Sequence, residues 1–271
     1  MVEYKDIQSK TILTPANGLL GDSEFTFTLN PYVGCSFGCT YCYVREMPGA
    51  KYREQEWGTY VDVKANAAEL LEKEIIKHKK KEKRIAIFMS TATDPYLGME
   101  AKTKLTRSLL EVMLNRIDDI DYLMVHTRSP LATRDIDLFQ QFGDKIIISM
   151  SIETDLEKVR KAFTPSAPPI PARLNALKKI TEAGVPTRAS VSPMLPLSKH
   201  IARTLKEVTN HVALDDFFMG DGSRGRRTER MGIRKIYERL NVMQWYHPDA
   251  YKKVLAILKE EFDEVYVFNE K

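Results

Sequence analysis

Cysteine is scarce in this sequence, with only three copies among 271 residues. A small, odd number argues against a disulfide framework and favours a reducing compartment. Long apolar runs are missing as well. No window approaches the roughly 18 consecutive apolar residues that a membrane span requires, and the opening stretch MVEYKDIQSK carries charges where a secretory signal is apolar. The sequence therefore excludes a disulfide-rich mini-protein and predicts a cytoplasmic protein with no membrane partner.

A strong charge of one sign is also absent. The chain has 41 Lys and Arg residues against 37 Asp and Glu residues, a net charge of +4, so only a local cluster of cations would argue for nucleic-acid binding. A hydrophobic fraction of 43% is ordinary for a globular protein and argues against disorder. Because composition does not shift along the chain, we expect a single domain over 1–271, with a core at about 25–220 and a C-terminal extension at about 221–271.

Short aliphatic or β-branched runs alternate along the chain with segments of helical periodicity. The runs predict strands at 25–30, 84–89, 122–126, 146–152, 186–191, 216–219 and 264–268. The periodic segments predict helices that include 66–80, 103–115, 134–142, 199–211 and 247–262. Apolar strands that alternate with helices are typical of a parallel sheet covered by helices. We therefore expect an α/β fold, either an open or partial (β/α) barrel of about six units or a doubly wound sheet.

The three cysteines lie close together, in the loop after the first expected strand. They form a C-x3-C-x2-C pattern made of Cys35, Cys39 and Cys42. Thiolates at this spacing select zinc or an iron–sulfur cluster. A structural zinc site requires four closed ligands, and the sequence offers neither a fourth cysteine nor a nearby histidine. A [4Fe-4S] cluster gains from an open iron, so the spacing favours a cluster over zinc or over three buried apolar thiols.

With Tyr41 before the last cysteine, the motif resembles the C-x3-C-x-aromatic-C motif of the radical S-adenosylmethionine (SAM) superfamily. The resemblance implies a partial (β/α)6 barrel of the TIM type with a C-terminal helix and strand. It also implies a [4Fe-4S] cluster held by Cys35, Cys39 and Cys42, with SAM on the fourth iron. Such enzymes cleave SAM reductively to a 5′-deoxyadenosyl radical that abstracts a substrate hydrogen, and an external flavodoxin or ferredoxin type donor supplies the electron.

Polar residues follow the expected strands, at the end where a parallel barrel carries its active site. Hydroxyls and a guanidinium suit the amino-acid part and the ribose of SAM, and an arginine here is suited to pair bidentately with the SAM carboxylate. The residues expected to bind the cofactor are Ser90, Thr93, Asp94, Arg128, Ser151, Glu153 and Ser192, and the resemblance adds Tyr41 and Tyr43 beside the adenine. For Thr93 and Asp94, capping of the following helix is an equal alternative.

The segment from Ser149 to Pro196 resembles the strand–helix–strand unit of the spore photoproduct lyase-like proteins, and STATDPYLGME resembles their second loop. In the lyase itself a cysteine of that loop donates the final hydrogen atom. The corresponding residue here is Thr91, whose O–H bond is too strong for that role. All three thiols belong to the cluster, so we do not expect the lyase's own repair reaction. Tyr96 is the candidate substitute donor, with aromatic packing as its alternative role.

A basic segment, GDGSRGRRTERMGIRK at 220–235, follows the last expected barrel strand on the catalytic side. We interpret it as a loop whose Arg224, Arg226 and Arg227 suit phosphate groups of a nucleic acid or of another phosphorylated substrate. An exposed loop without a partner is the commoner outcome. Three functions stay open: a radical SAM enzyme acting on such a substrate, one acting on a small metabolite or peptide, and a non-catalytic iron–sulfur or zinc protein.

Overall fold

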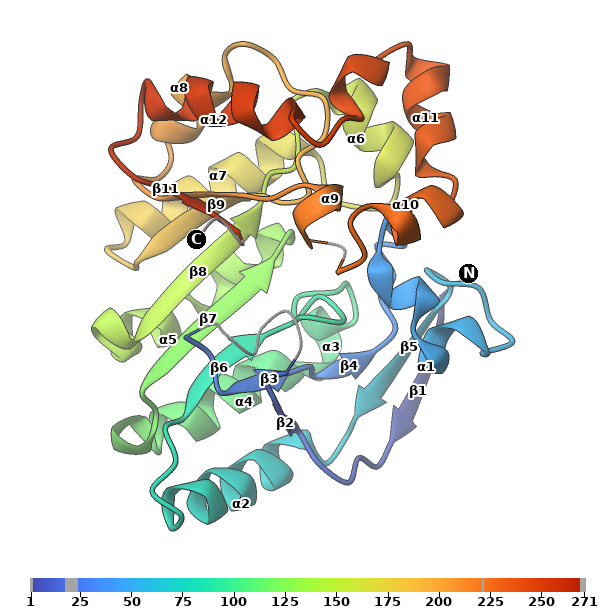
Figure 1. The fold of residues 1–271 in the computed structure, drawn as a ribbon. Helices are drawn as coiled ribbons and strands as arrows, with labels where there is room; N and C mark the ends of the chain where they lie inside the picture. The colour runs from blue at the N-terminus through green and yellow to red at the C-terminus, as the bar shows by residue number, and fades with distance from the viewer. Residues whose placement is uncertain (1, 18–23, 221, 269–271) are drawn as a thin grey trace.

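The computed structural model describes residues 2–17, 24–220 and 222–268. Its main sheet has eight strands in the order β11-β10-β9-β8-β7-β6-β3-β2, all parallel except for the antiparallel pair of β2 and β3 (Figure 1). The strands are β2 (Leu13–Pro15), β3 (Phe27–Leu29), β6 (Ala86–Met89), β7 (Tyr122–Thr127), β8 (Ile146–Ser151), β9 (Thr187–Val191), β10 (Val212–Leu214) and β11 (Val265–Val267).

The order of the parallel strands follows the order of the chain without a reversal. A doubly wound sheet has a switch point where the strand order reverses, so that alternative is wrong for this chain. The sheet stays open, because β2 and β11 form its two edges. The six strands from β3 to β10 match the expected partial (β/α)6 barrel, and α12 (Ala250–Lys259) with β11 forms the expected C-terminal extension. The fold class is thereby confirmed.

Helices connect the strands and lie on the outer side of the sheet (Figure 1). Their apolar residues recur at helical spacing and face the strands, as Leu109, Leu110 and Met113 do in α4. The other helices are α1 (Pro48–Lys51), α2 (Ala67–Lys79), α3 (Glu100–Thr103), α5 (Ile136–Phe139), α6 (Glu157–Phe163), α7 (Ile170–Glu182) and α8 (Ile201–Lys206), while α4 spans Leu105–Leu114. No helix within the described ranges is long and apolar enough to cross a membrane.

Short 3-10 helices complete the connections, at η2 (Tyr43–Glu46), η3 (Ile117–Asp119), η4 (Pro130–Asp135), η5 (Gln140–Lys145) and η6 (Met243–Trp245). The helix expected over 134–142 is therefore interrupted: η4, α5 and η5 share that stretch of chain. Pro130 begins η4, where its missing N–H group costs no hydrogen bond.

A second, smaller sheet supports the cysteine loop and was not expected from the sequence. It has the order β1-β5-β4, with β1 at Glu3–Ile7, β5 at Tyr60–Lys64 and β4 at Tyr32–Val33. Gly34 follows β4 with φ +87°, and a Cβ atom there would lie 2.5 Å from the Tyr60 ring and from its carbonyl oxygen. Only glycine fits this close approach. The small sheet thus fixes where the chain turns toward Cys35.

Two expectations near the C-terminus are wrong. The strand expected at 216–219 is instead helix α9 (Phe217–Gly220), and the strand lies earlier, at β10. Asp216 decides this, because its Oδ1 accepts hydrogen bonds from the backbone N–H groups of Phe218 at 2.8 Å and Met219 at 2.7 Å, which caps a helical turn. The basic segment is also not a loop: it contains α10 (Arg226–Arg230) and the start of α11 (Ile233–Leu240).

Candidate active site

A cavity of about 290 Å³ lies at the carboxyl ends of the barrel strands. Residues within the strands line it as well, so it reaches into the barrel. All three cysteines line it. Seven of the nine expected cofactor-binding residues line it as well, namely Tyr41, Tyr43, Ser90, Thr93, Asp94, Arg128 and Ser192. The other two, Ser151 and Glu153, are fully buried behind the cavity wall. The strand ends therefore meet where a parallel barrel places them.

Two tight turns fold the cysteine loop. The Gly38 N–H donates to the Cys35 carbonyl oxygen at 3.2 Å, and the Cys42 N–H donates to the Cys39 carbonyl oxygen at 3.2 Å. Thr40 anchors the loop, since its N–H and its hydroxyl both donate to the Phe163 carbonyl oxygen at 3.0 Å. The turns bring side chains three and four residues apart to the same cavity.

Burial and the neighbouring thiols raise the pKa values of Cys35 and Cys42. Burial raises the pKa of Cys42 to about 12, and the neighbouring Cys39 adds to the rise. Burial also raises the pKa of Cys35, with Cys39, Asp94 and Cys42 adding to it. These neighbours are close enough to oppose each other's negative charge. Because metal centres bind thiolates, assembly of a centre here must release the thiol protons.

The placement of the thiols fits a cluster better than a single ion. Among the residues that the structure describes, no group of three His, Cys, Asp or Glu side chains is arranged to hold one metal ion. A zinc ion would need every sulfur at about 2.3 Å from one point, whereas a four-iron cluster takes each thiolate on a separate iron. Three thiols that line one cavity, two of them buried and Cys42 partly exposed, are the donor set that such a cluster requires.

An ion-pair network lies directly behind the cysteines. Arg128 donates from Nη2 to Oε1 of Glu153 at 2.8 Å, and Arg173 donates from Nη1 to Oε2 at 2.7 Å. Tyr41 donates its hydroxyl to Oε1 at 2.8 Å. Burial alone would raise the pKa of Glu153, but the two guanidinium groups outweigh it and hold the pKa at about 2. Glu153 is thus an anion that positions two cations beside the cavity.

Part of the hydrogen-bonding capacity of Arg128 is already used in this network. Its Nε also donates to Glu153, at 3.2 Å, so two of its N–H groups already face a carboxylate. Bidentate pairing with the SAM carboxylate through that same edge would require Glu153 to move. The contact expected from the sequence must therefore use the remaining N–H groups of Arg128.

Thr93 and Asp94 are held by the protein itself. Thr93 donates its hydroxyl to the Gly34 carbonyl oxygen at 2.6 Å, which ties the loop after β6 to the cysteine loop. Asp94 accepts from the Thr127 hydroxyl at 2.7 Å and from the Arg128 backbone N–H at 2.9 Å. Both side chains line the cavity, but their hydrogen bonds hold neighbouring loops together.

Two polar groups on the cavity wall have no hydrogen-bond partner among the described residues. They are the Ser90 hydroxyl and the Trp57 indole N–H, both buried. Leaving such a group unpaired costs about 1–3 kcal/mol, so each marks a place where a polar ligand fits. Trp57 was not singled out in the sequence, since it lies before β5 and reaches the cavity only through the small sheet. These groups and the thiols fit SAM and an iron–sulfur cluster.

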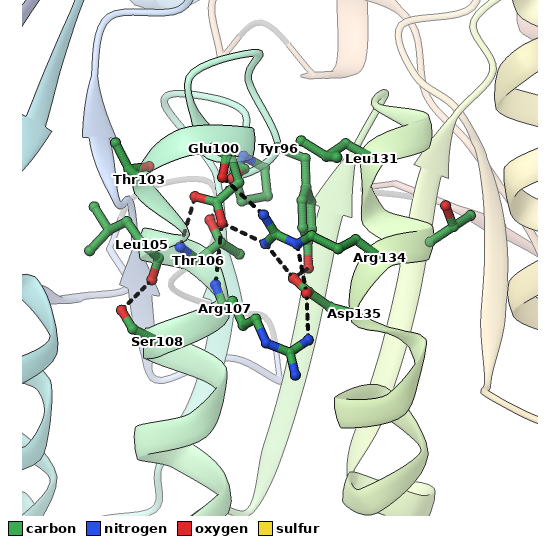
Figure 2. Close-up of polar contacts among 12 residues, drawn as sticks. Tyr96, Glu100, Thr103, Leu105, Thr106, Arg107, Ser108, Leu131, Arg134 and Asp135 are labelled. Carbon is green, nitrogen blue, oxygen red and sulfur yellow. Dashed lines mark hydrogen bonds and ion pairs between the residues drawn. The ribbon is translucent and has the colours of Figure 1, made fainter.

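Tyr96 lies away from the cavity lining. It is fully buried, and its hydroxyl donates to Oδ2 of Asp135 at 3.0 Å. Figure 2 shows the network to which it belongs: Arg134 bridges Asp135 and Glu100, and Arg107 donates to Asp135 at 2.9 Å. The network ties α3, α4 and η4 together behind the cavity. The structure thus gives Tyr96 a supporting position and no contact with the cavity.

Of the three expected substrate-binding arginines, Arg227 lies beside a residue of the cavity lining. The Arg227 guanidinium lies 6.0 Å from the centre of the Tyr43 ring, and Tyr43 lines the cavity. Arg224 and Arg226 are exposed, close in sequence to Gly220, which also lines the cavity. In Figure 1, α10 lies beside the segment that carries the cysteines. None of the three arginines lines the cavity itself, and Arg227 approaches it through Tyr43.

The cavity continues into the barrel interior, where Ser151 was expected from the sequence but Arg188 was not singled out. His126 lines it and bonds through Nε2 to the Ser151 hydroxyl at 2.9 Å and through Nδ1 to the Ser149 hydroxyl at 3.2 Å. Burial, assisted by Arg128 and Arg188, lowers the pKa of His126 to about 3, so the imidazole is neutral near pH 7. Arg188 and Tyr266 also line the cavity, and Tyr266 is 54% exposed.

Comparison with known proteins agrees with this geometry. Residues 29–208 match the family model described as the Radical SAM superfamily. Uncharacterized protein MJ0683 of Methanocaldococcus jannaschii is 35% identical over 170 residues, which cover 63% of this chain and 61% of that protein. Uncharacterized protein ORF301 of Acidianus two-tailed virus is 33% identical over 180 residues, which cover 64% of this chain and 57% of that protein. The chain thus spans less than two thirds of the length of these relatives.

Solved structures show the same fold. A spore photoproduct lyase variant with bound AdoMet and dinucleoside spore photoproduct superposes with a TM-score of 0.68, at 17% identity, over 99% of this chain and 82% of that one. Spore photoproduct lyase complexed with dinucleoside spore photoproduct gives a TM-score of 0.66, at 18% identity, over 97% of this chain and 81% of that one. At this identity the likeness establishes the fold alone.

Proposed function

Because the chain belongs to the radical SAM superfamily, we propose that it is an enzyme that cleaves SAM reductively to methionine and a 5′-deoxyadenosyl radical and uses this radical to abstract a hydrogen atom from a substrate. The observation that supports this most is the convergence of Cys35, Cys39 and Cys42 on one cavity wall. When bound there, a [4Fe-4S] cluster would pass to SAM the electron that this cleavage needs. An external donor of the flavodoxin or ferredoxin type would first supply that electron to the cluster.

The residues of the cavity divide into those that contact SAM and those that support them. Ser90 and Trp57 offer unpaired hydrogen-bonding groups to it. Arg128 offers a cation to the SAM carboxylate, oriented by Glu153 and, through it, by Arg173. Tyr43 and Ser192 complete the wall, while Tyr41, Thr93, Asp94 and Ser151 hold its loops and strands in position.

The substrate we propose is a nucleic acid or another phosphorylated molecule, because Arg227 lies beside Tyr43 of the cavity lining, with Arg224 and Arg226 close to it in the sequence. A small metabolite or a peptide is the alternative if these arginines are incidental. The repair reaction of the lyase is not part of the proposal: Thr91 stands at the position of its cysteine, and the sequence has no fourth thiol. Three free thiols and a low-potential electron donor also suit the reducing cytoplasm, where we place the enzyme.

The proposed cleavage can be tested directly. The protein is reconstituted anaerobically with iron and sulfide, reduced with dithionite and mixed with SAM. We expect 5′-deoxyadenosine and methionine in equal amounts, and a change in the EPR signal of the reduced cluster when SAM is added. If neither product forms and the EPR signal is unaffected, the non-catalytic iron–sulfur protein is the better description.

The phosphate-binding role proposed for these arginines predicts that DNA binding depends on salt concentration. Arg226→Ala and Arg227→Ala should each weaken retention on DNA, and each lost phosphate contact should reduce the slope of log K against log salt by about 0.9. Arg234→Ala is the matched control, because Arg234 is exposed and pairs at 3.1 Å with Glu238, which lies on the same helix, α11. Binding assays at several salt concentrations give the slopes. Equal slopes for all variants would favour the small metabolite or peptide.

A further inference from the structure

Arg188 lines the cavity near the start of β9. Arg188 and Ser190 of this strand and Ser192 directly after it line the cavity, as expected for a strand whose side chains alternate between two faces. Ser192 lies just beyond the carboxyl end of the strand. At about 3.3 Å per residue, Arg188 is about 13 Å farther from that end. It therefore belongs to the barrel interior and not to the cysteine end of the cavity.

The Arg188 guanidinium has weak partners. Its Nε donates to the Ser149 hydroxyl at a long 3.4 Å, and its Nη2 contacts the Met124 sulfur at 2.8 Å. Its central carbon lies 5.5 Å from the centre of the Tyr266 ring. No carboxylate in the described part of the chain lies within ion-pair distance of it. Other arginines of low exposure differ in this respect: Arg128 and Arg173 pair with Glu153, and Arg160 pairs with Glu157.

The groups around Arg188 offset its positive charge only in part, and none of them forms an ion pair with it in the described part of the chain. His126 is neutral, and Ser149 carries no charge. Tyr122, Tyr266 and Glu24 are close enough to favour the guanidinium charge, yet burial outweighs them and lowers the pKa of Arg188. A partly buried cation without an ion-pair partner is costly. An anionic group inside the cavity would remove that cost.

We propose that Arg188 is the anchor of an oxyanion subsite in the barrel interior, which takes a phosphate or carboxylate group of the substrate. The planar donors of a guanidinium match such a group in pairs, and the Ser149 and Ser190 hydroxyls stand beside it on the neighbouring strand and on β9. The subsite rests on the proposed function in one respect, namely that its ligand is the substrate of the enzyme. A molecule held there by its anionic end extends toward the cysteines.

The test uses inorganic phosphate and acetate as separate probes of the cluster-loaded protein, with ionic strength held constant by chloride. Thermal unfolding is followed anaerobically. At phosphate about ten times its half-saturating concentration, we expect the Tm of the wild type to rise by about 3–6 °C. Arg188→Met should show no rise. In chloride alone it should be at least as stable as the wild type, because it removes a partly buried charge and leaves no carboxylate unpaired.

Controls separate this subsite from general charge effects and from folding defects. Arg234→Ala should keep the full phosphate response, because Arg234 is exposed and already pairs with Glu238. Arg188→Lys should keep part of the response because the charge remains. If Arg188→Met does not fold, Arg188→Lys and Arg188→Gln are compared in the same way. A phosphate response that survives without the charge at this position, or a large loss of Tm in chloride for Arg188→Met, would overturn the proposal.

The same samples distinguish the two possible failures. If the wild type binds phosphate through Arg188 but forms no 5′-deoxyadenosine, the subsite stands and the proposed cleavage falls. If it forms 5′-deoxyadenosine while phosphate and acetate stabilise Arg188→Met and the wild type equally, the cleavage stands and the subsite falls. A larger response to phosphate than to acetate assigns the subsite to a phosphorylated substrate, and the reverse assigns it to a carboxylate.

Discussion

Replacing Cys39 with alanine should abolish both the iron–sulfur absorption of the reconstituted protein and its cleavage of SAM. The sequence has only three thiols, and all three line one cavity. With one removed, two protein ligands remain, and no other cysteine can take the missing place. Removing a residue that supports a metal ligand already costs about 10–100-fold in metal affinity or activity, so loss of a ligand itself should exceed about 100-fold. Iron analysis and 5′-deoxyadenosine measurements give both values.

The control for this variant is Ser36→Ala, in the same loop but without a thiol. It should keep its iron and its SAM cleavage. Cys39→Ala should still fold without the cluster, because replacing a buried sulfur with hydrogen leaves a cavity of about methyl size, at a cost of about 1 kcal/mol. Circular dichroism checks this. If Cys39→Ala retains four irons per chain and cleaves SAM, the cluster assignment is wrong.

This prediction uses the part of the site that sequence reasoning reached best. A ligand motif is local, so the spacing of the cysteines survives whatever the rest of the fold does. The ends of parallel strands are nearly as readable, because strand order and direction follow from the alternation of strands and helices. Arg128 and Ser90 were found in this way, and both line the cavity.

Arg188, in the barrel interior, was missed for a different reason. Arg188 and Ser190 on β9, Ser192 just after it, and Ser149 and Ser151 on β8 place polar residues at every second position. That period marks the inward face of a strand, and it is the signal that would have revealed the inner cavity. It was hidden because the intervening residues are apolar, so each strand reads as one buried run.

Other misses depend on contacts between distant segments. Trp57 reaches the cavity through a sheet that joins the N-terminus to β5. Asp216 precedes an apolar stretch that fits a strand and a helix equally well, and its cap decides for the helix. Tyr96 follows a barrel strand like the true lining residues, but Asp135 and Arg134 hold it outside the cavity. Local pattern carries no information on any of these contacts.

Glu153→Gln should lower the free energy of unfolding by about 3–5 kcal/mol, the usual cost of removing one partner from a buried ion pair. The Glu153 side chain is 1% exposed and pairs with Arg128 at 2.8 Å and with Arg173 at 2.7 Å. Glutamine keeps the shape and removes the charge. It leaves two guanidinium groups without their anion, and Nη2 of the buried Arg173 already lacks a hydrogen-bond partner among the described residues.

The pH dependence of stability provides a second measure of the same charge. Because the pKa of Glu153 is lowered from 4.5 to about 2, its contribution is present above pH 4.5 and is lost as the pH falls toward 2. A difference of this size corresponds to about 3 kcal/mol at neutral pH, in agreement with the mutational expectation. Glu153→Gln should therefore show a shallower loss of stability between pH 4.5 and 2 than the wild type.

Urea unfolding of the cluster-free protein, followed by circular dichroism, measures these differences. Glu238→Gln is the matched control: it removes the same charge from an exposed pair with Arg234 and should change stability by less than about 1 kcal/mol. Adding Arg173→Met to Glu153→Gln should recover part of the loss, because one of the two stranded cations is then gone. Equal urea midpoints for Glu153→Gln and the wild type would show that Glu153 does not hold these arginines, and the positioning of Arg128 beside the cysteines would need another explanation.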